Sequence, residues 1–231
     1  MKTKIKEEAN GGLIESVRIA IGKDHLEGEL GIPPDAQGIV LFAHGSGSSR
    51  HSPRNQFVAR TIRESGTGTL LFDLLTRVED NLTARLRFDI GLLARRLVEV
   101  TRWLAKNPET QRYGVGYFGS STGGGAALLA AAELGKDIDA VVSRGGRPDL
   151  AGDALPRVQS PTLLIVGGHD DVVIQLNKEA LAKLRCEREL KIIPGATHLF
   201  EEPGALEEVA RLAAEWFRRH LRLRAQTDAA N

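Results

Sequence analysis

Three side chains with the chemistry of a nucleophile, a base and an acid stand at separate points of this 231-residue sequence. Ser121 lies at the centre of a Gly-x-Ser-x-Gly motif, Asp170 follows a pair of glycines, and His198 follows a Pro-Gly stop. A serine hydroxyl is too weak an acid to attack a carbonyl unaided, so a base must take its proton. Histidine is suited to this because its pKa lies near neutrality, and a carboxylate on its other ring nitrogen holds the required tautomer. Together the three residues predict hydrolysis through a covalent intermediate.

The residues around Ser121 predict a strand that turns sharply into a helix. An apolar run at 115–118 precedes the serine, and a run of small residues at 126–134 follows it. Glycines flank the turning residue, where a Cβ would clash. Such a turn exposes the hydroxyl and places its backbone N–H at a helix N-terminus, where partial positive charge collects. The alternative is a glycine-rich turn in which Ser121 or Thr122 only caps the helix.

A serine nucleophile also needs N–H donors for the oxygen on which negative charge develops. Thr122, the residue after the nucleophile, provides one, and the loop after an early strand provides another. That loop reads His44-Gly45-Ser46-Gly47 and follows the apolar run at 38–43. The alternative for this loop is a glycine and serine turn without a role in the reaction.

The elements that must position these residues alternate along the chain. Two segments with alternating polarity, 13–21 and 26–32, predict an antiparallel hairpin whose first strand is an edge strand. Strands are expected at 38–43, 69–72, 115–118, 140–142, 162–166 and 190–193, of which 38–43 and 69–72 read as buried. Helices are expected at 56–65, 88–105, 126–134, 176–184 and 203–221, and a charged loop at 73–83. This order predicts an α/β fold with a mostly parallel sheet and helices on both faces.

The three chemical residues each come just past a predicted strand. In open α/β sheets, ligands bind at the carboxyl ends of the strands. The chain order of Ser121, Asp170 and His198 is the order found in hydrolases built on a serine turn of this kind. Asp171 is an alternative to Asp170 as the acid, because the two are adjacent in the sequence.

The sequence resembles the α/β-hydrolase superfamily, and within it the dienelactone hydrolase-like branch, from about residue 13 to residue 220. The motifs that carry the resemblance are Ala43-His44-Gly45-Ser46-Gly47-Ser48, Gly119-x-Ser121-x-Gly123, Gly167-Gly168-x-Asp170 and Pro194-Gly195-Ala196-x-His198. The resemblance implies an α/β-hydrolase fold without a large lid. It also implies that Asp170 is the acid and that the backbone N–H of Ser46 is the second oxyanion donor, with Gly47 as the alternative. Dienelactone hydrolases proper use a cysteine where this chain has Ser121, which favours a general esterase.

We therefore expect a serine hydrolase that cleaves small carboxylic esters through an acyl-enzyme on Ser121. The alternatives are a lactone, dienelactone or thioester hydrolase with the same residues, a hydrolase of an amide or carbon–carbon bond, and a non-catalytic binding module on the same fold. Further candidates for substrate contact are His44, Gly45, Gly47, Arg144 and Arg147. His44 is expected to order its own loop through a hydrogen bond. The two arginines follow a strand, where they bind a substrate carboxylate or pair with a nearby aspartate.

Composition and charge narrow the function further. The net charge of +1 gives no electrostatic reason to expect nucleic acid or an anionic membrane as a partner. The first ten residues lack the apolar core of a signal peptide, and no apolar run reaches the roughly 20 residues of a membrane span. The single cysteine, Cys186, cannot form an internal disulfide, which fits a reducing compartment. We expect a cytoplasmic protein whose partner is a small-molecule ester, while its oligomeric state stays open.

No cofactor or metal ion is expected. The histidines and carboxylates lack ligand spacing such as His-x-x-x-His, and the glycines after Ser121 lack the Lys-Ser/Thr end of a phosphate loop. We expect a single domain over residues 1–231, with its core at about 13–221 and a frayed C-terminal tail at 224–231.

Overall fold

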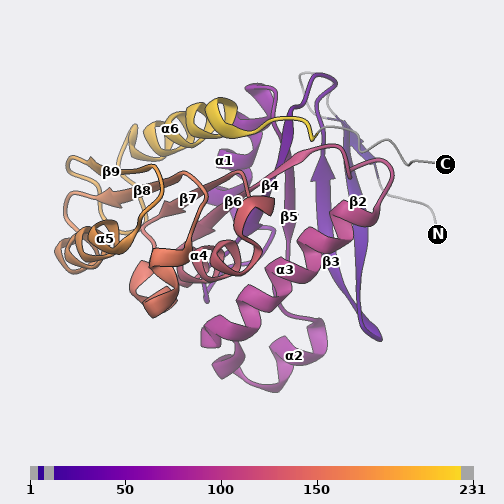
Figure 1. The fold of residues 1–231 in the computed structure, drawn as a ribbon, viewed down its shortest axis with the longest axis horizontal. Coiled ribbons are helices and arrows are strands. Elements are labelled where there is room, and N and C mark those ends of the chain that lie inside the picture. The colour runs from indigo at the N-terminus through magenta and orange to yellow at the C-terminus, as the bar shows by residue number, and fades with distance from the viewer. Residues whose placement is uncertain (1–4, 8–12, 225–231) are drawn as a thin grey trace.

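One sheet of nine strands forms the centre of the molecule (Figure 1). The structure is a computed structural model, and it describes residues 5–7 and 13–224. The strands are β1 (Ile5–Glu7), β2 (Leu13–Ile21), β3 (Asp24–Gly31), β4 (Gly38–Ala43), β5 (Gly68–Phe72), β6 (Gly114–Ser120), β7 (Ala140–Arg144), β8 (Thr162–Gly167) and β9 (Arg188–Ile193). Their order across the sheet is β1-β2-β3-β5-β4-β6-β7-β8-β9.

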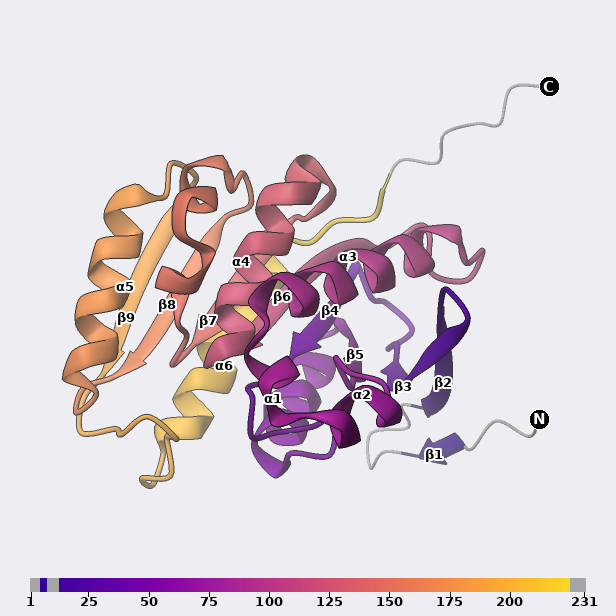
Figure 2. The ribbon, with the colours of Figure 1, turned by 90° about the horizontal axis from the view of Figure 1, so that it is seen from below.

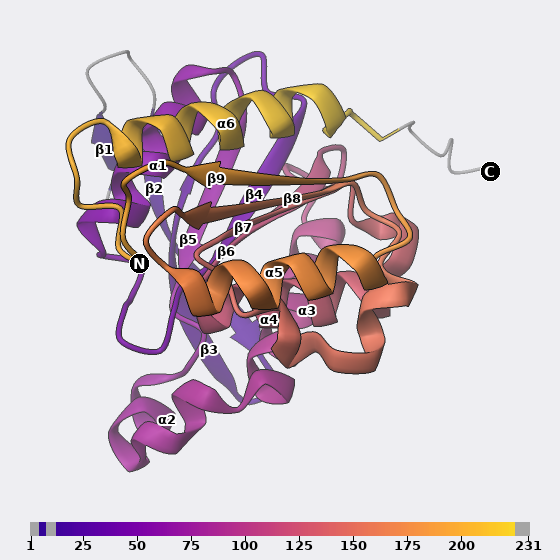
Figure 3. The ribbon, with the colours of Figure 1, turned by 90° about the vertical axis from the view of Figure 1, so that its left-hand side faces the viewer.

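Helices cover both faces of this sheet, which lies between two helical layers in Figure 3. The α-helices are α1 (Pro53–Glu64), α2 (Arg77–Leu82), α3 (Ile90–Lys106), α4 (Thr122–Leu134), α5 (Asp171–Lys183) and α6 (Ala205–His220). Three 3-10 segments are η1 (Ala84–Phe88), η2 (Gly135–Asp137) and η3 (Pro148–Arg157). Figure 2 shows α5, α4 and α3 side by side along one face, while α1 and α6 pack together on the other.

The pairing of the strands confirms the predicted architecture. β4 to β9 pair in parallel, in the order β5-β4-β6-β7-β8-β9. β2 and β3 form the predicted antiparallel hairpin, and β3 joins the parallel part through antiparallel pairing with β5. The prediction of β2 as an edge strand is wrong, because β1 pairs along its outer side.

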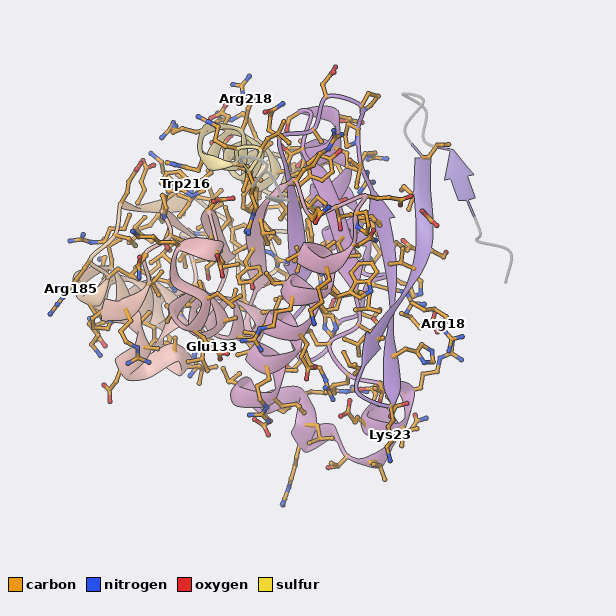
Figure 4. The ribbon with its side chains drawn as sticks, turned by 45° about the vertical axis from the view of Figure 1, so that its right-hand side comes forward. Arg18, Lys23, Glu133, Arg185, Trp216 and Arg218 are labelled. Carbon is orange, nitrogen blue, oxygen red and sulfur yellow. The ribbon has the colours of Figure 1, made fainter. Side chains whose placement is uncertain are left out.

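Two apolar layers hold the helices against the sheet. All six residues of β4 are buried, as expected for a strand covered on both faces. Its side chains alternate, so Ile39 and Leu41 pack among residues of α3 and α4, while Val40 and Phe42 pack among residues of α1 and α6. Arg18, Lys23 and Arg185 lie outside these layers, and Figure 4 shows them pointing away from the body of the protein.

Several predicted boundaries differ from the structure for local reasons. α1 begins at Pro53 and not at residue 56, because the Ser52 side chain accepts a hydrogen bond from the Asn55 N–H and proline fits the first turn. The segment predicted as a loop at 73–83 contains α2 and leads into η1. Its signal was Thr76-x-x-Glu79, a capping box in which both reciprocal hydrogen bonds are present.

The expected frayed tail lies outside the described residues except for Arg224. Just before it, Leu221 to Arg224 run along the start of β6, where Gly114 N–H donates to the Arg222 carbonyl. Within residues 5–7 and 13–224, no helix is long and apolar enough to cross a membrane.

Candidate active site

Ser121 occupies a strained turn between β6 and α4. Its backbone has φ 52° and ψ −123°, a conformation that costs a non-glycine residue on the order of 1–3 kcal/mol. Three backbone hydrogen bonds fix it. The Ser121 N–H donates to the Arg144 carbonyl at 3.2 Å, and its own carbonyl accepts from Gly124 and Arg147, each at 3.0 Å. The serine turn, residues 119–123, is therefore tied to the end of β7.

The glycines on either side of Ser121 are required by close backbone contacts. A Cβ on Gly123 would lie 2.0 Å from the Ala43 carbonyl oxygen, and a Cβ on Gly119 would lie 2.5 Å from the Gly123 carbonyl oxygen. The first contact involves the end of β4. The motif thus lets the serine turn approach the strand that leads into the loop at 44–47.

His198 and Asp170 lie together at the carboxyl ends of the neighbouring strands. Asp170 follows β8 and precedes α5, and His198 lies in the loop after β9. The Nδ1 atom of His198 is 2.6 Å from Oδ2 of Asp170. Asp171 is the exposed first residue of α5 and makes no described contact with His198. The hydrogen bond occupies Nδ1 and leaves Nε2 to serve as a base.

The loop that carries His198, after β9, approaches the serine turn at the end of β7. Gly145 lies there with φ +52°, and a Cβ on it would come within 3.4 Å of His198 Cε1. The residue before it, Arg144, accepts the Ser121 N–H hydrogen bond. Ser121, His198 and Asp170 therefore belong to one edge of the sheet, as their positions after strands predicted.

The loop at 44–47 covers the serine turn from the opposite side. A Cβ on Gly45 would lie 3.2 Å from the Ser121 Cβ. The Ser46 N–H donates to the Thr122 hydroxyl at 3.1 Å. Ser46 and Thr122, which are far apart in the sequence, thus meet directly beside Ser121.

His44 is partly buried and fastens this loop to the chain after β5. Its Nε2 atom accepts a hydrogen bond from the Leu74 N–H at 3.2 Å, so the proton is on Nδ1, which donates to the Gly45 carbonyl at 3.0 Å. Burial lowers the pKa of His44. The ring is neutral in this arrangement, and its two hydrogen bonds set the position of Gly45 against Ser121.

The two candidate arginines have different environments. Arg147 forms a bidentate pair with Asp149 at 2.7 and 2.8 Å. Arg144 is buried and meets no carboxylate within the described residues; its Nη2 is 3.4 Å from Asn55 Oδ1, and its guanidinium lies 5.7 Å from the centre of the Phe200 ring. Burial and the nearby charge of Arg54 lower the pKa of Arg144 to about 10. Only Arg144 therefore retains an uncompensated buried charge beside the site.

An open pocket with a cavity volume of about 120 Å³ adjoins the loop at 44–47. Its apolar lining comes from Leu74, Leu75 and Leu93. The charged residues in its wall are Asp73, Arg77, Asp80 and Arg87. Sequence patterns did not indicate this lining, because it is assembled from the chain after β5, α2, η1 and α3. The capping box of α2 was the only local signal that a folded wall exists here.

The remaining chemical candidates lie elsewhere. Among the residues that the structure describes, no group of three or more His, Cys, Asp or Glu could hold a metal ion. Cys186 lies 3.8 Å from the hydroxyl of Thr162, at the amino end of β8. Burial raises the pKa of its thiol. Cys186 is thus near the amino ends of the parallel strands, whereas Ser121 follows the carboxyl end of β6.

The strand order, the serine turn and the positions of Asp170 and His198 are those of an α/β-hydrolase fold. A solved dienelactone hydrolase from Anabaena variabilis shares 60% identity with this chain, with a TM-score of 0.90 over 91% of this chain and 99% of that one. Est1E from Butyrivibrio proteoclasticus shares the fold at 17% identity, with a TM-score of 0.75 over 88% and 98% of the two chains.

The chain belongs to the dienelactone hydrolase family, whose model it matches over residues 29–226. It is also 57% identical over 207 residues to proteins of two Mycobacterium tuberculosis strains, CDC 1551 and H37Rv, that are provisionally named phosphoribosyl transferases. The match covers 90% of this chain and 46% of those proteins, so the chain spans about half the length of these curated relatives.

Proposed function

We propose that this protein is a hydrolase that cleaves small carboxylic esters through an acyl-enzyme on Ser121. The observation that carries the proposal is the 2.6 Å hydrogen bond between His198 and Asp170, placed across Gly145 from a strained serine turn. A base oriented by a carboxylate, beside a partly exposed serine, is the constellation that activates a hydroxyl for attack. A binding module would have no need for the strain at Ser121.

In the acylation step, the Ser121 hydroxyl oxygen attacks the ester carbonyl while Nε2 of His198 takes its proton. Asp170 holds the Nδ1–H and stabilises the imidazolium. The tetrahedral intermediate collapses, His198 returns the proton to the departing alcohol, and the acyl group stays on Ser121. In the second step His198 takes a proton from water, the hydroxide oxygen attacks the acyl carbonyl, and the acid leaves as Ser121 regains its proton.

The negative oxygen of both intermediates needs preorganised donors. The backbone N–H groups of Thr122 and Ser46 are the proposed donors, and each such donor contributes on the order of 10²–10³ in rate. The contact between Ser46 and Thr122 supports their placement on one side of Ser121. Gly45 is the proposed close neighbour of the substrate carbonyl, held by His44, and Gly47 lies one residue further along this loop.

The substrate is proposed to place its acyl group or its alcohol group in the pocket of about 120 Å³ beside the loop at 44–47. Leu74, Leu75 and Leu93 suit a short apolar group, and the pocket is too small for a long lipid chain. Arg144 favours an ester or lactone that also carries a carboxylate, because the arginine has no described acidic partner. Arg147 is not proposed as a substrate contact, because its charge is already neutralised by Asp149.

The test uses purified protein with p-nitrophenyl acetate and butyrate. Ser121→Ala should abolish turnover, whereas Ser120→Ala, a change at the neighbouring buried residue of β6, should retain it. A fluorophosphonate should label the wild type and not Ser121→Ala. Activity that persists in Ser121→Ala would refute the proposal. A lactone and a thioester in the same panel separate the related reactions, because all of them use the same acyl-enzyme.

A further inference from the structure

Thr122 carries a hydroxyl that the reaction as described above does not use. The hydroxyl oxygen accepts the Ser46 N–H at 3.1 Å. Thr122 directly follows Ser121, is the first residue of α4, and is 7% exposed. The contact therefore lies where the oxygen of a tetrahedral intermediate on Ser121 must be held.

A backbone N–H has one hydrogen to donate. While Ser46 donates it to the Thr122 hydroxyl, that hydrogen is not available to an oxyanion. The Thr122 hydroxyl, in contrast, keeps its own hydrogen, for which the described part of the chain provides no acceptor. The N–H and the hydroxyl of Thr122 belong to the residue that directly follows Ser121, so one residue can supply two donors at this position.

We propose that the Thr122 hydroxyl is a direct donor to the oxyanion, and that the Ser46 N–H acts through it. This rests on the proposed esterase function and revises its oxyanion hole, because the Thr122 hydroxyl takes the place of the Ser46 N–H as the second direct donor beside the Thr122 N–H. The Ser46 N–H fixes the side-chain rotamer of Thr122 and draws electron density from its oxygen. A hydroxyl that accepts a hydrogen bond becomes a stronger donor, because consecutive hydrogen bonds polarise one another.

The arrangement of the loop supports this relay. A Cβ added to Gly45 would lie only 3.2 Å from the Ser121 Cβ, and the His44 ring donates a hydrogen bond to the Gly45 carbonyl. The loop is therefore already seated against the serine turn, and no movement of Ser46 is needed when the substrate binds. Direct donation by Ser46 would instead require the Thr122 side chain to rotate away first, which breaks a hydrogen bond before one forms.

The two mechanisms predict opposite effects of Thr122→Val, which removes the hydroxyl and keeps the shape of the side chain. If Thr122 donates to the oxyanion, kcat should fall by roughly 10²–10³, the loss measured for an oxyanion donor, with little change in KM. If Ser46 donates directly, its N–H is set free and kcat should stay the same or rise. Thr122→Ser restores the hydroxyl and should recover most of the lost rate.

A second readout separates donation from a general effect on the fold. A trifluoromethyl ketone forms a tetrahedral adduct with an oxyanion on Ser121, so its inhibition constant should rise in Thr122→Val by about the factor lost from kcat. Thr61→Val, on α1 and away from the serine turn, is the control for the Thr-to-Val change; its hydroxyl bonds to the Phe57 carbonyl. The thermal midpoints of all variants are compared.

The outcomes distinguish this inference from the proposed function. If the wild type cleaves esters and Ser121→Ala does not, the esterase proposal stands whatever Thr122 does. Under that condition, a Thr122→Val variant as active as the wild type overturns the role of the hydroxyl. A loss in Thr122→Val that Thr122→Ser does not recover, or one that leaves the affinity for the ketone unchanged, overturns it as well.

Discussion

Replacing Asp170 with asparagine tests the proposed orientation of the base. The carboxylate oxygen Oδ2 lies 2.6 Å from Nδ1 of His198. An asparagine amide presented to Nδ1 favours the opposite tautomer, in which Nε2 carries the proton and cannot accept one from Ser121. The corresponding change in a serine protease costs about 10⁴ in kcat while leaving the geometry intact. At about 1.36 kcal/mol per factor of ten, this is about 5.4 kcal/mol of transition-state stabilisation.

The stability of the fold should change little in the same variant. Asp170 precedes α5, but its side chain makes no capping hydrogen bond to the helix. Its contact with His198 is partly solvated, since 39% of the histidine side chain is exposed. An exposed pair of this kind contributes at most about 1 kcal/mol. A large loss of activity with an almost unchanged thermal midpoint is therefore the signature that we expect.

Asp171→Asn is the matched control. Asp171 is exposed at the start of α5, where its charge contributes about 0.3–1 kcal/mol through the helix dipole and has no described contact with His198. The assay is kcat and KM for p-nitrophenyl acetate at pH 7.5, with thermal midpoints for the three proteins. If Asp171→Asn lost activity on the scale of 10⁴ and Asp170→Asn stayed near the wild type, the assignment would be wrong.

Three further predictions concern the surroundings of the serine turn. Gly45→Ala adds a Cβ 3.2 Å from the Ser121 Cβ and should displace the loop at 44–47, which lowers kcat by up to roughly 10². Gly47→Ala is the control, because a Cβ at Gly47 would have no neighbour within 4 Å. An equal loss of kcat in Gly47→Ala would contradict this reasoning. Arg144→Met removes an uncompensated buried charge and should raise the free energy of unfolding in urea by about 1 kcal/mol or more. Arg147→Met, the control, breaks an exposed ion pair that contributes less than about 1 kcal/mol. A lower urea midpoint for Arg144→Met than for the wild type would refute the claim that the buried charge is destabilising. Burial lowers the pKa of His44 below its unfolded value, so its contribution to stability is complete above pH about 6.5 and decreases as the pH falls toward the folded pKa. His44→Gln should flatten the slope of urea midpoints between pH 7 and 5, and an unchanged slope would show that His44 does not titrate there.

The architecture was predictable because its strands are simple. β4, β6 and β8 are buried on both faces, so each appears in the sequence as a continuous apolar run. The position of Ser121, Asp170 and His198 at one edge follows from the same alternation, since the carboxyl ends of parallel strands lie together. β1 could not be foreseen, because a three-residue strand carries no periodicity.

Which of the two arginines after β7 would lack an acidic partner could not be predicted. Arg144 and Arg147 are three residues apart after the same strand, and both have aspartates nearby in the sequence. Residue alternation in β7 places Arg144 on the face covered by α1, next to Asn55, where there is no described carboxylate. Arg147 lies beyond Gly145 and reaches Asp149 instead. This difference depends on the turn after β7, which local sequence patterns do not determine.

The wall of the pocket was missed for another reason. The charge of the segment 73–83 suggested a solvated loop, and neither α2 nor η1 has a buried residue to reveal a helical pattern. α2 is held instead by its capping box and by an ion pair between Glu79 and Arg96 of α3. Periodicity detects helices that bury an apolar face, so a short polar helix fixed at one end escapes it.

Two unfavourable features meet at the end of β7. Ser121 adopts a positive φ, and Arg144, whose carbonyl binds the Ser121 N–H, keeps a buried charge that no described carboxylate neutralises. Each lowers the stability of the fold, and the apolar layers on both faces of the sheet compensate for them. Residues that break local rules without a structural gain are expected at functional sites. Ser121 and Arg144 are joined by one hydrogen bond, and both lie near His198. Their proximity supports the end of β7 as the reaction centre, independently of any sequence motif.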